Sequence, residues 1–280
     1  TFSVFLHKTL TFFDMKKTFL LLALCLGVFT SCGFEEKIKA QTEQTEIENL
    51  EIPQSKQTNN DIILHHKGYS VGYNTDNLLP NWVAWELYKE KLTEDASRYK
   101  KFLPDPDLPK EYAITTHEYT HSGWNRGHMC PAADNKWDAD AMKESFYTTN
   151  ICPQNENLNK GDWNDLEEAC REWAMTESVY IVCGPVLYKE PVYGFIGKEF
   201  EIRVPEAFYK VVLKGIESGN PQAIGFIFKN QSGNNKLYKY VNTIDEVERI
   251  TGIDFFPALD DEIETQVEAK YDLEQWELNR

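Results

Sequence analysis

The sequence predicts a mixed α+β domain, because strand-like apolar runs occur both before and after one central amphipathic helix. The helix is expected over residues 163–176, behind a break and an N-cap at Gly161 and Asp162. Four of its apolar residues recur at spacings of 3, 4 and 3, namely Trp163, Leu166, Cys170 and Trp173. We expect this stripe to pack in the core.

Strands are expected on both sides of that helix. Before it, residues 62–64 and 68–73 are typical of a hairpin. After it, residues 179–182, 209–213 and 223–228 are apolar runs of strand length, and the last two are joined by a turn. No internal repeat and no phosphate-cradling glycine-rich loop is found.

Further helices are expected at three places. Pro80 would open one that carries Trp82 and Trp85 near helical spacing, and residues 141–146 form a weaker candidate. Thr243 begins a capping box with a glutamate three residues later. The acidic residues 259–280 are expected to form a partly loose helical tail, which leaves residues 59–258 as one folded domain.

Composition excludes whole classes of protein. The chain has 280 residues, of which 41% are hydrophobic and 26% charged, so it is neither disordered nor collagen-like. Its formal net charge of -16 argues against general binding of nucleic acid through a basic surface. Any chemistry on nucleic acid must therefore be confined to a local site, and a bound cation would help to overcome the repulsion.

Residues 1–32 resemble an export signal. Met15 is followed by two lysines, by the apolar run 19–29 and by a short segment that ends in Cys32. The apolar run is too short for a comfortable transmembrane helix. The segment resembles a bacterial lipobox, so we expect Cys32 to be lipidated and the protein to be exported and membrane-anchored; the alternative is an ordinary signal and a secreted protein. Residues 33–58 are expected to be a flexible tether.

Four cysteines remain within the domain: Cys130, Cys152, Cys170 and Cys183. Export makes disulfides plausible, and four cysteines allow three pairings that the sequence does not distinguish. Buried free thiols are the alternative. A zinc site formed by Cys130 with His117, His121 and His128 is conceivable, although this spacing matches no common ligand pattern.

Two polar clusters carry the residues for chemistry. In the first, Arg126 and His128 would share one face of a strand, where Arg can bind phosphate oxygens and His can accept a proton. The second contains Asn150, Asn159 and Glu167, whose oxygen atoms are ligands suited to Mg²⁺ or Ca²⁺. Alone, each cluster also fits a surface turn or an Asn-rich loop.

Together the clusters resemble the DNA/RNA non-specific endonucleases of the ββα-metal class. That family carries Asp-Arg-Gly-His, then Asn-x-x-Pro-Gln-Asn, then Asn-x-x-x-Trp-x-x-Leu-Glu. Here the motifs begin at Asn125, Asn150 and Asn159, and weaker similarity continues to residue 257. The resemblance implies a central antiparallel sheet flanked by helices, with hydrolysis of DNA and RNA to 5′-phosphate and 3′-hydroxyl ends.

The resemblance also implies a role for each residue. His128 would be the general base, and Asn159 the protein ligand of Mg²⁺, with Mn²⁺ or Ca²⁺ as other candidates. Glu167 would hold a metal-bound water and Arg126 would stabilise the developing charge. Asn150 would help to position the site, and Arg98 is a looser match for a second phosphate-binding arginine.

Two features depart from the family pattern. Asn125 stands where the family has Asp, so its charge is lost but some of its hydrogen bonds can remain. Cys130 and Cys152 each lie two residues beyond a catalytic candidate, so a Cys130–Cys152 bridge, with Cys170–Cys183 as the other pair, would lock the site if the strands are adjacent.

The spacing of Asn159 and Glu167 predicts a break between them. Eight residues of continuous helix would separate them by about 12 Å, too far to share one hydrated ion. We therefore expect Asn159 in the loop before Asp162 and Glu167 on the helix. Two other functions stay open, a catalytically silent surface lipoprotein that binds a ligand and a phosphodiesterase for a smaller diester. Oligomeric state is not indicated by the sequence.

Overall fold

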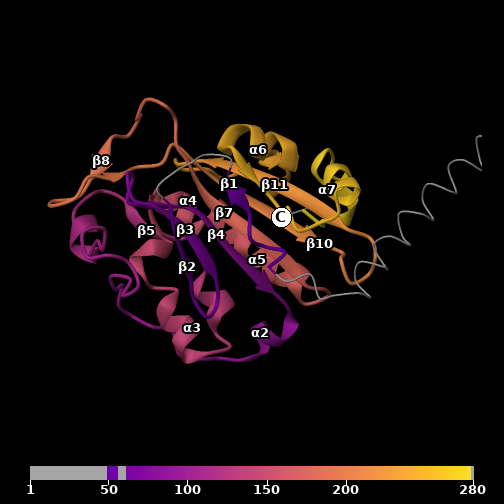
Figure 1. Cartoon of the computed structure of the whole chain (residues 1–280), viewed down its shortest axis with the longest axis horizontal. Coiled ribbons are helices and arrows are strands. Elements are labelled where there is room, and N and C mark those ends of the chain that lie inside the picture. Colours follow the sequence, from indigo (N-terminus) through magenta and orange to yellow (C-terminus); the bar gives the residue numbers. More distant parts are fainter. Residues whose placement is uncertain (1–48, 56–60, 279–280) are drawn as a thin grey trace, which may run out of the picture. The chain divides into compact units, whose positions relative to one another are not determined.

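A seven-stranded antiparallel sheet forms the centre of the computed structural model, which describes residues 49–55 and 61–278 (Figure 1). The strands lie in the order β12-β11-β10-β7-β4-β3-β2. Their bounds are β2 Asp61–His65, β3 Ser70–Asn74, β4 Leu79–Leu87, β7 Val179–Val186, β10 Ala207–Lys214, β11 Gln222–Lys229 and β12 Val241–Asn242. The expected α+β class with a central antiparallel sheet is confirmed.

Helices and three small strand pairs surround this sheet. The helices are α2 Lys89–Thr93, α3 Ala139–Glu144, α4 Glu156–Lys160, α5 Asp162–Ala174, α6 Ile244–Thr251 and α7 Asp261–Glu268. The short pairs are β1 Gln54–Ser55 with β13 Ile253–Asp254, β5 Asn125–His128 with β6 Ile151–Gln154, and β8 Phe195–Ile196 with β9 Ile202–Arg203. Two of the 3₁₀ turns border the site: η1 Thr116–Tyr119 and η3 Thr148–Asn150.

Strand β10, next to the central strand β7, separates two layers of core. Its side chains alternate between the faces of the sheet, as expected for a strand. Phe208 contacts Trp163 of α5 on one face, whereas the ring of Tyr209 contacts Phe255 on the other. Helix α6 packs so closely on the second face that a Cβ at Gly225 would lie 2.7 Å from Val247. The catalytic candidates all lie on elements of the α5 side.

The segment that begins at Pro80 is a strand, not the helix that its tryptophan spacing suggested. β4 lies between β3 and β7, and Trp82, Val83, Ala84 and Trp85 are all buried. A strand covered on both faces shows a continuous apolar run without alternation, and such a run can also match helical spacing. Tertiary burial therefore overrode the local pattern.

Other expectations from the sequence are confirmed. The first hairpin is formed by β2 and β3, and the central helix is α5. Thr243 caps α6, because its side chain accepts a hydrogen bond from the Glu246 N–H at 3.2 Å. The cap of α5 differs slightly from the expectation. Gly161 is the N-cap residue, and Asp162 already belongs to the first turn.

The folded unit extends beyond the expected limits at both ends. Leu50 is buried and β1 pairs with β13, so residues 49–55 are not part of a free tether. In the acidic tail, Trp276 is fully buried against Trp173, whose indole N–H donates to the Trp276 carbonyl at 3.1 Å. The tail is therefore docked rather than loose.

The N-terminal expectations cannot be compared with this structure. Cys32 and the export-like segment lie outside the described residues. Among the residues that are described, no helix is both long and apolar enough to span a bilayer.

Candidate active site

The candidate site is built on a pair of strands and on the two consecutive helices that follow them. β5 and β6 are antiparallel, and His128 lies opposite Ile151. Gly127 is needed here, because a Cβ at this position would run into the side chain of Gln154 on the opposite strand. Helices α4 and α5 follow β6 directly, so the strands and helices together form the ββα arrangement that the motifs implied.

Asn159 lies on a helix, and the expectation that it lies in a loop is wrong. Asn155 caps α4 by accepting hydrogen bonds from the N–H groups of Asn157 and Leu158, which allows one helical turn to form. The expected break is nevertheless present. Gly161, with φ −109° and ψ −116°, separates α4 from α5. Asn159 and Glu167 are therefore on two different helices.

Two phenylalanine rings gather the three basic candidates into one cluster. The ring of Phe102 lies 5.4 Å from the imidazole of His128 and 5.1 Å from the guanidinium of Arg126. The ring of Phe146 lies 4.9 Å from His128 and 5.2 Å from the guanidinium of Arg98. Arg98, the loosest match in the sequence, is thus brought to His128. Neither phenylalanine was singled out from the sequence.

His128 is neutral at physiological pH. Burial, and secondarily the positive charge of Arg98, lower its pKa to about 3. Its Nε2 atom is buried and has no hydrogen-bond partner among the described residues. A neutral imidazole with an unsatisfied nitrogen can accept a proton, which is the property that a general base requires.

Asn150 is a positioning residue. Its side chain is fully buried and bonds to the backbone of Cys130 and to the carbonyl of Ser145. It is therefore satisfied by the protein itself. We conclude that Asn150 holds the end of β5 in place and has no free group to offer to a substrate.

Asn159 and Glu167 fit a hard divalent cation. The amide of Asn159 is partly exposed and has no side-chain hydrogen bond within the described part of the chain. Burial raises the pKa of Glu167 to about 7, with Lys210 opposing this shift and Asp134 adding to it. A nearby cation would stabilise the ionised form of this carboxylate. An amide carbonyl oxygen on α4 and a carboxyl group on α5 are the types of oxygen donor suited to Mg²⁺.

A buried cluster of charged residues, Lys210, Asp134 and Arg171, interacts electrostatically with Glu167. Lys210 is fully buried, and its ammonium group lies 4.5 Å from the ring centre of Trp163 and 5.2 Å from that of Trp85. The indole of Trp85 donates to Asp134 at 3.1 Å, and Arg171 forms an ion pair with the same carboxylate. Burial disfavours the charge of Lys210, but its ionisable neighbours, Cys183 first and then Glu167, Cys170 and Asp134, outweigh this effect and raise its pKa.

Sequence analysis missed this cluster, although two signals were present. Arg171 lies four residues after Glu167, so both are on the same side of α5. Lys210 interrupts an apolar strand at a position where its neighbours on the same face, Phe208 and Val212, are buried. A charged residue at a core position of a strand indicates a buried partner.

Positively charged side chains gather around His128, although the protein is acidic. Arg98, Lys100, Lys101 and Arg126 are exposed, and none of the four has a carboxylate partner within the described residues. The ring contacts place Arg98 and Arg126 beside His128, and the two lysines follow Arg98 in the chain. The site therefore has the local basic character that the overall charge lacks.

A sequence profile of the DNA/RNA non-specific endonuclease family matches residues 48–262 of this chain. The chain belongs to this family. The matched range contains every catalytic candidate named above, from Arg98 to Glu167.

Named relatives agree with this membership. The mitochondrial nuclease EXOG of Mus musculus is 36% identical over 210 residues, which cover 70% of this chain and 57% of the relative. A nuclease of Nostoc is 32% identical over 231 residues, which cover 78% of this chain and 81% of the relative. The chain thus spans little more than half of the animal relative. A solved structure of an EndoG/EndoGI complex has a TM-score of 0.65 at 25% identity, covering 71% of this chain and 86% of that one.

The disulfides expected in this nuclease-family domain are absent. Cys130, Cys152, Cys170 and Cys183 are free and buried. The register explains the first pair, because Cys152 lies opposite Gly127, three residues before Cys130. Because β5 and β6 are antiparallel, Cys130 and Cys152, each two residues after His128 or Asn150, are displaced in opposite directions and do not lie opposite each other. Burial raises the pKa of the Cys170 and Cys183 thiols to about 12, so they are unreactive core residues.

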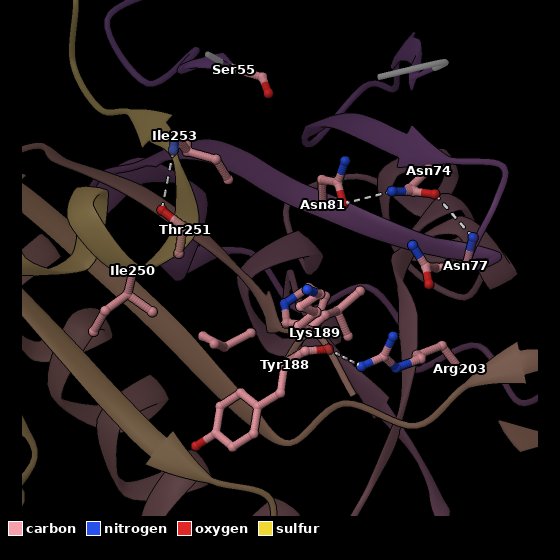
Figure 2. Close-up of a pocket in the computed structure, with 13 residues that line it drawn as sticks. Ser55, Asn74, Asn77, Asn81, Tyr188, Lys189, Arg203, Ile250, Thr251 and Ile253 are labelled. Atoms are coloured by element: carbon pink, nitrogen blue, oxygen red, sulfur yellow. Dashed lines mark hydrogen bonds between the residues drawn. The ribbon is translucent and has the colours of Figure 1, made fainter. Parts of the chain in front are cut away.

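Three other polar regions of the domain do not contain the catalytic candidates. Within the described residues, two groups of side chains are close enough to share a metal ion, one around His66 and Asp105 and one around Glu268, and neither includes the histidines or the cysteine of the conceivable zinc site. A polar cleft of about 270 Å³ lies where β4 begins and β7 ends (Figure 2). Its lining includes Asn74, Asn77, Asn81 and Arg203.

Proposed function

We propose that this chain is a Mg²⁺-dependent nuclease that hydrolyses phosphodiester bonds in DNA and RNA and leaves 5′-phosphate and 3′-hydroxyl ends. One observation carries this proposal: Arg98 and Arg126 flank the neutral imidazole of His128 over a floor of two phenylalanine rings. Two guanidinium groups beside one base suit an anionic diester and a water nucleophile.

His128 would take one proton from the attacking water. As the water oxygen bonds to phosphorus, the bond from phosphorus to the 3′ oxygen breaks, and this oxygen takes up a proton to become the 3′-hydroxyl group. With a pKa of about 3 the imidazole is a weak base, so this pKa has to rise when the substrate binds. Approach of the anionic diester would offset the charge of Arg98, which is one of the two causes of that low pKa.

The arginines would bind and orient the diester. Arg126 is exposed and donates to the hydroxyl of Thr116, which directs its guanidinium along η1. Arg98 lies over the ring of Phe146, whereas Arg126 lies over that of Phe102. Charge-assisted hydrogen bonds from both would stabilise the extra negative charge on the phosphate oxygens as the reaction proceeds.

Asn159 and Glu167 are the residues that would hold the metal ion, Asn159 directly and Glu167 through a water molecule. When bound there, Mg²⁺ would supply positive charge to the phosphate oxygens and to the leaving oxygen. Lys210 would keep the carboxylate of Glu167 in place from beneath. Mn²⁺ and Ca²⁺ also prefer oxygen ligands and are the other candidates.

The matched pair Asn159→Ala and Asn157→Ala tests the metal site. Both residues are on α4, and Asn157 is exposed, with a side chain that donates to the hydroxyl of Ser232. We expect Asn159→Ala to lose heat of Mg²⁺ binding in calorimetry and to lower cleavage about 100-fold or more. Asn157→Ala should behave like the wild type. Equal Mg²⁺ binding by both variants would exclude Asn159 as the ligand.

Substrate controls in the same assay decide between the alternatives. Cleavage of a small model diester without cleavage of plasmid or RNA would identify a phosphodiesterase for smaller substrates. If neither is cleaved by folded protein, a ligand-binding lipoprotein becomes the better account. We also propose export and lipid anchoring through Cys32, for which metabolic labelling with palmitate is the test. A wild-type label that persists in Cys32→Ser would reject that anchor.

A further inference from the structure

An arm of exposed aromatic residues projects beside the candidate site. The arm comprises residues 187–206, which connect β7 to its neighbour β10 and contain the β8–β9 pair. Val186 and Ala207 are already paired across the two strands, so a turn of a few residues would suffice to join them. Long connections in compact domains are usually functional. Figure 1 shows β8 at the same end of the domain as β5.

The arm is held by two buried carboxylates. Glu206 accepts hydrogen bonds from the backbone N–H groups of Tyr188 and Val192, both at 2.8 Å. Glu118 of η1 accepts from the backbone of Lys198 at 2.5 Å and of Glu199 at 3.0 Å. The backbone of the arm is therefore fixed at its base and near its tip.

Figure 2 shows the base of the arm. The guanidinium of Arg203 donates to the carbonyl of Tyr188, while the ring of Tyr188 points away from this contact. Arg203 also lies 3.4 Å from the Glu206 carboxylate, so its charge is used within the fold. The polar cleft beside it is thus part of the support of the arm.

The apolar side chains of the arm are left in solvent. Phe195 is 50% exposed, Tyr188 47%, Tyr193 38% and Val192 64%. Four large apolar residues are thus exposed within one short segment, and a concentration of exposed apolar side chains is typical of a binding surface on soluble proteins. Because the backbone of the arm is already fixed, its exposed rings can bind a partner with little loss of conformational entropy.

The arm is continuous with the candidate site. The ring of Tyr193 packs edge-on at 5.2 Å against Trp124, the residue that precedes β5. η1 contacts both the arm and the site: its Glu118 accepts hydrogen bonds from the arm, and its Thr116 accepts one from Arg126. Lys198 on the arm is exposed and has no carboxylate partner within the described residues.

We propose that the arm binds unpaired nucleotides next to the cleaved phosphate, with bases stacked on Phe195 and Tyr193 and phosphates near Arg126 and Lys198. This inference rests on the proposed nuclease function and specifies its substrate class as single-stranded nucleic acid or unpaired stretches. Every base has a face that can stack on an aromatic ring, so this mode of binding is independent of sequence. Stacking also supplies affinity where a net charge of -16 gives no general attraction to phosphates.

Fluorescence anisotropy with the His128→Ala protein tests this proposal without cleavage. The probes are a labelled oligothymidine of about 20 nucleotides and a duplex of the same length. We expect Phe195→Ala and Tyr193→Ala each to raise the Kd for the single strand about tenfold, with little change for the duplex. Phe195→Leu, which keeps apolar bulk without a ring, should lose affinity as Phe195→Ala does.

Tyr238→Ala and Tyr271→Ala are the matched controls, because both tyrosines are exposed but lie outside the arm. They should bind both probes like the parent protein. Affinity of the arm variants equal to these controls, or equal loss for single strand and duplex, would overturn the proposal. So would a change in oligomeric mass without a change in affinity, since the arm would then bind a second copy of the chain.

A cleavage assay distinguishes failure of this inference from failure of the proposed function. It uses the wild type and the same arm variants with His128 retained. If the protein cleaves plasmid and RNA but the arm variants bind normally, only the role of the arm is wrong. If the protein cleaves neither, the nuclease function itself fails, whatever the binding result.

Discussion

Asn150 bonds to both backbone polar atoms of Cys130: its Oδ1 accepts from the Cys130 N–H at 2.8 Å, and its Nδ2 donates to the Cys130 carbonyl at 2.9 Å. The side chain thus pairs with the backbone as a neighbouring strand would. Cys130 comes two residues after His128, so this contact fixes the course of the chain as it leaves the catalytic strand.

Asn150→Ala should destabilise the protein. It leaves the Cys130 N–H and carbonyl and the Ser145 carbonyl without this partner in a buried region, at a cost of about 2–4 kcal/mol. Urea unfolding measures this loss. The residual folded enzyme should also cleave more slowly, because His128 is less well placed. An unfolding midpoint equal to that of the wild type would show that Asn150 does not hold the strand.

Lys210→Met should be destabilising, although it introduces an apolar side chain into the core. The substitution removes the cation that faces Asp134 and Glu167 and leaves these buried acids less compensated, at a cost of about 3 kcal/mol. Lys214→Met, on the same strand, is the control. Its ammonium group donates to the carbonyl of Gln275 and forms an ion pair with the partly exposed Glu177 at 3.4 Å, and its loss should cost about 1 kcal/mol, less than the loss of Lys210. Equal midpoints for the two variants in guanidinium would contradict the charge cluster.

The imidazole of His128 should stay neutral from pH 8 down to pH 5. With a folded pKa of about 3 against about 6.5 in the unfolded chain, its neutral form is fully favourable above pH 6.5. That contribution to stability is lost as the pH falls from 6.5 toward 3, where the unfolded chain binds the proton more readily. NMR titration of the ring protons checks this. Arg98→Ala should raise the pKa modestly, since burial is the larger cause; a His128 transition near pH 6.5 in the wild type would refute it.

Glu268→Gln should stabilise the protein at alkaline pH. Burial, followed by the nearby Glu248, Glu264, Asp245 and Asp254 carboxylates, raises the pKa of Glu268 to about 9. The protonated form favours the fold below about pH 4.5, and this advantage is lost as the pH rises through 9. The variant should therefore melt about 2–4 °C higher at pH 8 and like the wild type at pH 4. A lower melting temperature at pH 8 would contradict the raised pKa.

The local motifs were predictable from the sequence, because short-range chemistry determines them. Residues 125–128 and 150–155 form the strand pair that the motifs implied, and the capping residues of α6 were visible as a local pattern. The approach of Arg98 to His128 was only a weak expectation, because it depends on where Phe102 and Phe146 pack. That packing is a tertiary contact which no local spacing encodes.

The errors share a cause in tertiary structure. β4 resembled a helix because its residues are buried on both faces, which removes the alternation of a strand. The Cys130–Cys152 bridge failed because antiparallel register cannot be obtained from distances along the chain. The tail is docked because Trp276 finds Trp173, a contact between residues far apart in sequence. The buried role of Lys210 was not predicted for the same reason, because Asp134 and Glu167 are far from it in the sequence.

The most direct test of the account is cleavage of supercoiled plasmid and total RNA by the wild type and by His128→Ala, with Mg²⁺ or with EDTA. The account predicts that the wild type cleaves both substrates only with Mg²⁺, and that His128→Ala is slower by about 100- to 10,000-fold while it remains folded. Cleavage by His128→Ala at the wild-type rate, or cleavage by the wild type in EDTA, would contradict the assignment of His128 as the base of a metal-dependent nuclease.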